Sequence, residues 1–110
     1  MSSKIDLYVP INSEHKGSLS IEGNARIDGA FVGNLYCEGT VVIGLQGQVE
    51  GDVQCMNAEI SGHFKGRMQV FKNCTLFQKA EFSGLLDTGL CLLNEGALFR
   101  GEIIIRGQSS

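Results

Sequence analysis

The sequence predicts an all-β protein, a right-handed parallel β-helix (solenoid) of about six rungs with about 17 residues in each rung. Three observations support this fold class. A five-residue phrase with a central glycine recurs along the chain, apolar and polar residues alternate around it, and no segment keeps the 3.6-residue period of a helix. The chain has 110 residues, of which 43% are hydrophobic, so it suits one domain with a modest core.

The phrase has an apolar residue on each side of its glycine, as in VEGDV (49–53) and FRGEI (99–103). Successive glycines are 15 to 18 residues apart. They are Gly17, Gly33, Gly51, Gly66, Gly84 and Gly101. Two residues before them stand His15, Phe31, Val49, Phe64, Phe82 and Phe99, and two residues after them stand Leu19, Leu35, Val53, Met68, Leu86 and Ile103. A further apolar column follows at Ile27, Ile43, Ile60, Leu76 and Leu93. Stacked rungs would turn each column into a ladder inside the coil.

These columns divide the chain into three parts. Residues 1–16 are expected to be a flexible N-terminal segment, because they precede the first glycine phrase and contain the only proline, Pro10. Residues 17–105 are expected to form the β-helix domain, and residues 106–110 (RGQSS) a short C-terminal tail. The gaps between phrases vary and no hexapeptide repeat persists, which favours a right-handed coil over a left-handed one.

Composition excludes several classes of function. The net charge of −3 is not that of a nucleic-acid-binding protein, for which a basic face is expected. The start of the chain, MSSKIDLYVPI, has no apolar run of signal-peptide length, and no segment could cross a membrane as a helix. We therefore expect a soluble, cytoplasmic protein.

No residues form a recognisable catalytic, metal or cofactor site, and we expect a protein that is not an enzyme. The four cysteines have no CxxC spacing and are interpreted as small core residues: Cys37, Cys55, Cys74 and Cys91. His63 lies in an expected turn without an evident partner. The run GLQGQVEG (44–51) lacks the Lys-Ser/Thr pair of a phosphate-binding loop. Alternation places Glu50, Asp52 and Glu59 in solvent, where a carboxylate is hard to tune for acid–base work.

The last rungs are more apolar than alternation requires. The segments LLDTGLCLLNEGALF (85–99) and EIIIRG (102–107) place leucines and isoleucines at positions that should face solvent. No helix or charged loop is predicted to cover either end of the coil, although solenoids usually have polar caps. An uncapped rung presents unpaired backbone groups that can pair with another chain.

The run IDGAFVGNLYCEGTVVIGLQGQVEGDV (27–53) resembles the bactofilin signature, and GALFRGEI (96–103) resembles the closing phrase of that family. The resemblance covers about residues 17 to 105. It implies a bacterial cytoskeletal scaffold: a right-handed β-helix that polymerises with itself, end to end and without nucleotide, into non-polar filaments. It also implies a role in cell shape or in the localisation of cell-wall enzymes, often at the inner face of the cytoplasmic membrane. Many members have a hydrophobic N-terminal membrane motif, for which this chain offers only residues such as Leu7, Tyr8 and Val9.

The predicted functional residues are therefore end residues. The predicted C-terminal polymerisation interface is Phe99, Ile103 and Ile105, and the predicted N-terminal one is Leu19, Ile21 and Ile27. Leu7, Tyr8 and Val9 are the predicted contact with a membrane or a partner. The alternative is a ligand-binding or acyltransferase-like β-helix enzyme, although the chain lacks the hexapeptide repeat and an acyl-acceptor histidine.

Overall fold

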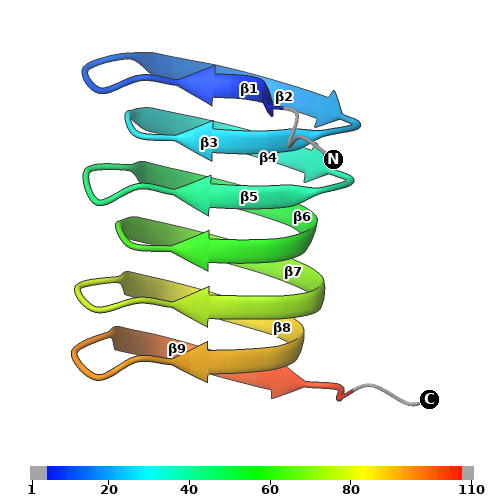
Figure 1. Ribbon diagram of the computed structural model, residues 1–110, viewed down its shortest axis with the longest axis vertical. Coiled ribbons are helices and arrows are strands. Elements are labelled where there is room, and N and C mark those ends of the chain that lie inside the picture. The colour runs from blue at the N-terminus through cyan, green and yellow to red at the C-terminus, as the bar shows by residue number, and fades with distance from the viewer. Residues whose placement is uncertain (1–4, 108–110) are drawn as a thin grey trace.

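The computed structural model describes residues 5–107, and within this range it contains nine strands in one all-parallel solenoid (Figure 1). The strands are β1 (Ile5–Val9), β2 (Glu14–Ile21), β3 (Asn24–Ile27), β4 (Ala30–Cys37), β5 (Thr40–Ile43), β6 (Gln48–Ile60), β7 (His63–Leu76), β8 (Glu81–Leu93) and β9 (Leu98–Ile105). The chain crosses the front of the view from right to left and the back from left to right as it descends, so the coil is right-handed. The predicted fold class is confirmed.

Each rung has three faces. The first face runs up to the phrase glycine, the second follows it, and the third holds the apolar column that includes Ile43 and Ile60. In the first rungs the third face is a separate strand, β1, β3 or β5. In the later rungs one long strand, β6, β7 or β8, covers all three faces.

Two corners account for the irregular spacing of the glycine phrases. The corner between the third and first faces holds either two residues, as at 28–29 and 61–62, or four, as at 10–13, 44–47, 77–80 and 94–97. The corner between the second and third faces also varies, because the register shifts at 56 in β6 and at 71–72 in β7. The strands stay in register because the corners absorb each difference in length.

The core consists of the predicted ladders. Three phenylalanines in the first-face column are almost fully buried, and the rings of Phe64 and Phe82 lie with their centroids 4.8 Å apart. The second-face column from Leu35 to Leu86 and the third-face column from Ile27 to Leu76 are equally buried. Because each apolar side chain that leaves water contributes about 1.5–3 kcal/mol, a rung is stable only against its neighbours.

The phrase glycines form a ladder at the bend between the first and second faces. Their φ angles lie between 128° and 138°, a region that other residues rarely adopt. At Gly66 a side chain would also overlap the carbonyl oxygen of Gly51 in the rung before it. The recurring phrase is therefore required both by the backbone conformation and by the close approach of neighbouring rungs.

Both predicted boundaries of the coil are corrected. Residues 5–16 are not a flexible segment before the coil, since β1 pairs in parallel with β3 and the first half of β2 pairs with β4. The tail does not begin at 106, because the Arg106 and Gly107 amides donate to the carbonyls of Thr88 and Gly89. The sequence missed the first strand because the third face has no glycine marker. The parts of the predicted segments at 1–4 and 108–110 lie outside the described residues.

Candidate functional site: the open ends of the solenoid

The C-terminal end of the coil is the outer side of β9 together with the third face of β8. Among the described residues β9 pairs only with β8, so its outer backbone groups have no strand beside them. The described part of β9 covers only the first and second faces of the last rung. Within residues 5–107, the third-face segment 90–93 of β8 therefore has no further strand beside it.

The predicted C-terminal residues all lie on this end. Phe99 stacks on Phe82 with ring centroids 4.9 Å apart and an interplanar angle of 10°, and it is half-buried because nothing covers its outer face. Ile103 lies over Leu86 and is also half-buried. Ile105 lies beside Thr88 and is 56% exposed, although its column is buried in the preceding rungs.

The structure adds two residues to this end that the prediction missed. Leu93 continues the column of Leu76 and is 50% exposed, whereas Leu76 is 0% exposed. Cys91 lies beside Cys74 in the neighbouring rung and is half-buried. The column position of Leu93 could be predicted from the sequence, since it comes 17 residues after Leu76, but the exposure of both residues is seen only in the structure.

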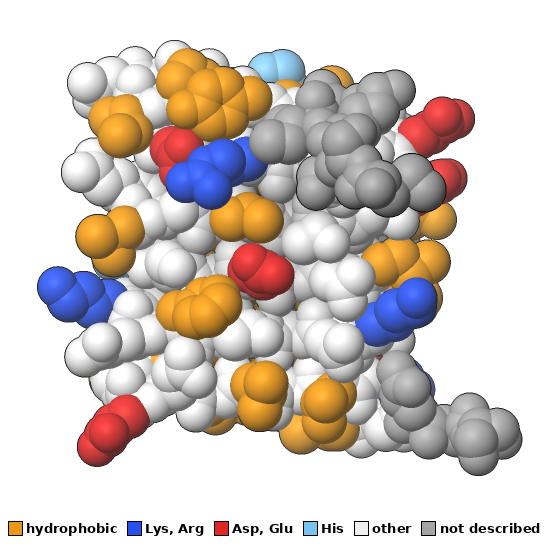
Figure 2. All heavy atoms as spheres, in the orientation of Figure 1, with side chains coloured by type: hydrophobic (Ala, Val, Ile, Leu, Met, Phe, Trp, Pro, Cys, Tyr) orange, Lys and Arg blue, Asp and Glu red, His pale blue; other side chains and the backbone are white. Residues whose placement is uncertain are grey.

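Apolar side chains also lie on the flank of the last two rungs. Leu90, Leu92, Leu98 and Ile104 are each at least 40% exposed, as the excess of apolar residues in these segments predicted. Figure 2 shows hydrophobic side chains gathered along the lower edge of this face, where β8 and β9 lie. The apolar surface therefore continues from the end of the coil onto its sides.

The N-terminal end is formed by β1 and β2. Leu19 and Ile21 lie at this end, on the first full rung, and are half-buried against the core. His15 occupies the place of phenylalanine and stacks on Phe31 with centroids 5.4 Å apart. The placement of Ile27 at this end is wrong, because Val9 lies beside it in β1 and Ile27 is 0% exposed.

The predicted membrane or partner contact at Leu7, Tyr8 and Val9 is changed by strand β1. Val9 is 4% exposed and belongs to the core, and Leu7 packs against that core. Tyr8 points the other way and is 56% exposed. An alternating strand cannot present all three side chains to one partner surface, and of the three only Tyr8 is largely exposed. Within residues 5–107 there is no helix that could span a membrane.

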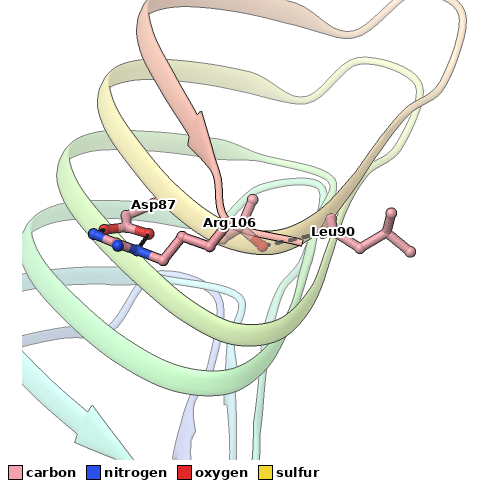
Figure 3. Close-up of polar contacts among 4 residues, drawn as sticks. Asp87, Leu90 and Arg106 are labelled. Atoms are coloured by element: carbon pink, nitrogen blue, oxygen red, sulfur yellow. Dashed lines mark hydrogen bonds and ion pairs between the residues drawn. The ribbon is translucent and has the colours of Figure 1, made fainter. Parts of the chain in front are cut away.

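A salt bridge closes the C-terminal end of β9 (Figure 3). The Arg106 guanidinium donates to both carboxylate oxygens of Asp87, at 2.7 Å each, and holds the pKa of Asp87 below its usual range. The buried Thr88 hydroxyl donates to the carbonyl of Leu90 at 3.0 Å, while the Leu90 side chain points away from this cluster. These contacts fix where the chain leaves the coil.

The Asp87→Asn variant should loosen this exit at neutral pH. The lowered pKa of Asp87 means that its stabilising effect is present at neutral pH and is lost as pH falls through the folded-state pKa. We expect faster amide hydrogen exchange at Arg106 and Gly107 in the variant at pH 7, with little change in the central rungs. The difference from the unmodified chain should disappear at acid pH, and a difference that persisted there would mean that the ion pair is not its cause.

The flank of the first face carries a shallow groove. Its lining includes Glu50, Lys65, Glu81 and Arg100, and His63 lies there with its Nε2 3.3 Å from a carboxylate oxygen of Glu81. The sequence reading of His63 as a residue without a carboxylate partner is therefore wrong, since Glu81 follows it in the same column one rung later. Both side chains are about half exposed, so this pair is a surface contact in solvent.

The described residues contain no group of three or more His, Cys, Asp or Glu side chains that could hold a metal ion. Opposite charges lie in register on neighbouring rungs, with Glu50 beside Lys65 and Asp52 beside Arg67. The two ends of the coil are therefore the candidate functional surfaces. In the described residues each combines exposed ends of apolar columns with the unpaired edge of a strand.

Comparison with known proteins identifies the same architecture. The family model described as "Bactofilin: Polymer-forming cytoskeletal" matches residues 8–104. None of the curated proteins compared matches the chain. A cryo-EM reconstruction of Thermus thermophilus bactofilin double helical filaments matches with a TM-score of 0.84 and 29% identity, covering 89% of this chain and 97% of that one. A crystal structure of a mutant of the same bactofilin matches with a TM-score of 0.74 and 28% identity, covering 79% and 97%.

Proposed function

The chain belongs to the bactofilin family of polymer-forming cytoskeletal proteins, and we propose that it polymerises end to end through the two open ends of its solenoid. The observation that carries this proposal is the state of the last rung. Phe99, Ile103 and Ile105 each continue a core column, yet each is uncovered on its outer side. Another copy placed against this end would bury these side chains and could pair with the free edge of β9.

We infer that joints form between like ends, so that the filament has no polarity. The inward-facing columns at the C-terminal end are apolar on all three faces, so two such ends can cover each other with apolar side chains. The N-terminal end has a different chemistry, with His15 in the phenylalanine column and Leu19 and Ile21 beside it. Two-fold pairing at both ends would alternate the direction of successive copies.

Purified protein without nucleotide should form filaments. The joints proposed here use apolar contact and strand edges, so assembly needs no bound nucleotide or metal. Negative-stain electron microscopy of the protein in a nucleotide-free buffer with a metal chelator is the direct measurement. A solution that light scattering shows to be purely monomeric at micromolar concentration would contradict the proposed polymerisation.

In the cell we propose that the polymer supports cell shape or positions cell-wall enzymes at the inner face of the cytoplasmic membrane. Its family supports the scaffolding role, and the exposed Tyr8 beside the N-terminal end offers one point of contact. A fluorescent fusion should form stationary structures at the cell envelope that are lost when Phe99 is replaced by arginine. A fusion that diffused freely in both forms would argue against the scaffold.

A further inference from the structure

Two cysteines meet at the open C-terminal end of the coil. Cys74 in β7 and Cys91 in β8 are register partners on neighbouring parallel strands of the third face. They continue a column whose other members, Ala25, Val41 and Ala58, are buried, so both thiols point into the coil. Neighbouring strands lie about 4.8 Å apart, which is within the roughly 4.4–6.8 Å between Cα atoms that a disulfide spans.

Cys91 differs from the other cysteines in its exposure. Cys37, Cys55 and Cys74 are at most 2% exposed, whereas Cys91 is half-buried. Within residues 5–107 no strand follows the third face of β8, because β9 pairs only with its first and second faces. A small molecule that approaches the end of the coil can therefore reach Cys91 and, through it, only Cys74.

The pair also has the electronic arrangement of an attacking and a resolving thiol. A hydrogen bond from the Cys74 thiol lowers the pKa of Cys91 to about 7, although partial burial opposes this effect. The same hydrogen bond, together with burial, raises the pKa of Cys74. Burial raises the pKa of Cys55 to about 12. The thiolate is the form that reacts, and of the two thiols Cys91 is the one whose pKa favours it.

We propose that Cys91 and Cys74 form a thiol–disulfide exchange site at the open C-terminal end, with a low-molecular-weight disulfide as its substrate class. The Cys91 thiolate attacks one sulfur of the disulfide, whose S–S bond breaks, and a thiolate leaves with the electron pair. Cys74 then attacks Sγ of Cys91 and releases the second thiolate, which takes up the Cys74 proton. The two cysteine thiols are oxidised to one S–S bond, and the small disulfide is reduced to two thiols.

This site is coupled to assembly, and that coupling rests on the proposed end-to-end polymerisation. A copy seated on the C-terminal end would cover Cys91 together with Leu93 and Phe99. Filaments would then protect the site, and free ends would expose it. Oxidation would in turn change the side chains that a joining copy meets.

The test uses oxidised glutathione and the full chain carrying Phe99→Arg, which leaves the C-terminal end free. Circular dichroism first establishes that the variant is folded. Intact-mass measurement and peptide mapping should then show the loss of two hydrogen atoms and a single Cys74–Cys91 disulfide, with Cys37 and Cys55 unchanged. A product that stops as a glutathione adduct of Cys91, or a Cys91 that reacts no faster than Cys55, would overturn the proposal.

Two further variants in the same background define the roles of the two thiols. With Cys74→Ala the product should remain a glutathione adduct, formed about fivefold to tenfold more slowly at pH 7 because less of Cys91 is thiolate. Cys55→Ala removes a buried cysteine from another column and should leave the rate and the product unchanged. An intrachain disulfide that still formed without Cys74 would assign the resolving role elsewhere.

The unmodified chain separates this inference from the proposed function. In filaments the glutathione reaction should be at least about tenfold slower than in the Phe99→Arg chain, because only terminal copies expose Cys91. Filaments that reacted at the variant's rate would show that the C-terminal joint does not cover Cys91. If the unmodified chain formed no filaments, the proposed polymerisation would fail, while the exchange reaction would still be tested by its own products.

Discussion

The Phe99→Arg variant is expected to fold into the same solenoid and to form only short, soluble oligomers. Phe99 is the last ring of a stack in which Phe64, Phe82 and Phe99 follow one another at 4.8 and 4.9 Å between centroids. Its inner face is packed and its outer face is free, so an arginine here can turn its charge toward solvent in the isolated chain. The substitution should therefore act mainly on the binding of another copy to the C-terminal end.

The Phe99→Arg substitution should weaken assembly far more than it weakens folding. A joint at this end would bury the outer face of Phe99, a gain of about 1.5–3 kcal/mol for a side chain of this size. An arginine in the same place would instead lose hydration without a carboxylate to pair with, at a cost of several kcal/mol. The sum of the two effects corresponds to a loss of at least a hundredfold in the affinity of the joint.

Phe71→Arg is the matched control. Phe71 lies at a corner of β7 in the middle of the solenoid, where it is 49% exposed, so the same change of residue is made on the flank. Electron microscopy should show filaments for Phe71→Arg and none of comparable length for Phe99→Arg, with circular dichroism confirming that both are folded. Filaments of ordinary length from folded Phe99→Arg protein would remove Phe99 from the joint.

The glycine phrase made most of the fold predictable. Glycine tolerates a positive φ and a close backbone approach, and it recurs with an apolar residue two positions before and two positions after it. These apolar residues predicted the columns of the first and second faces. The third face has no such marker, which is why β1 was taken for a segment outside the coil and Ile27 for an end residue. Cys91 and Leu93 lie on this same face, and their exposure could not be predicted because it depends on which residues of β8 pair with β9.

The number of residues between phrases was a poorer guide to the structure than the order in which the phrases follow one another. Gaps of 15 to 18 residues arise from corners of one, two or four residues, which differ in length while the strands stay in register. Salt bridges across rungs, such as that between Asp87 and Arg106, follow from the register once the corners are known. Sequence periodicity therefore predicted the inside of the coil well and its boundaries poorly.

Gly66→Ala is expected to cost about 2–6 kcal/mol of folding stability. The φ of Gly66 is 133°, and an added Cβ would overlap the carbonyl oxygen of Gly51. This overlap can be relieved only if two rungs move apart at the centre of the solenoid, where β6 and β7 are paired. The total free energy of unfolding of a domain of this size is about 5–15 kcal/mol. Chemical denaturation should therefore show a greatly lowered midpoint or no folded state. Stability within about 1 kcal/mol of the unmodified chain would mean that neighbouring rungs can move apart at this bend.

Gly17→Ala makes the same change at a bend where no earlier rung lies beside it among the described residues. The φ of Gly17 is 128°, so the backbone strain of about 1–3 kcal/mol remains, but an added Cβ has nothing within 4 Å. At the other phrase glycines an added Cβ would point toward the backbone of the preceding rung. At Gly17 the Cβ would therefore point out of the N-terminal end. We expect a folded chain, more stable than Gly66→Ala, whose N-terminal end can no longer accept a closely packed copy.

The two end variants together test whether the joints are symmetric. If like ends pair, Gly17→Ala should stop at dimers joined by their C-terminal ends, and Phe99→Arg at dimers joined by their N-terminal ends. If unlike ends pair, each variant alone should be monomeric, because every joint would contain the altered surface. Mixing the two would then produce dimers from the intact C-terminal end of one and the intact N-terminal end of the other. Analytical ultracentrifugation of each variant and of the mixture distinguishes the arrangements, and monomers that form dimers only on mixing would exclude a non-polar filament.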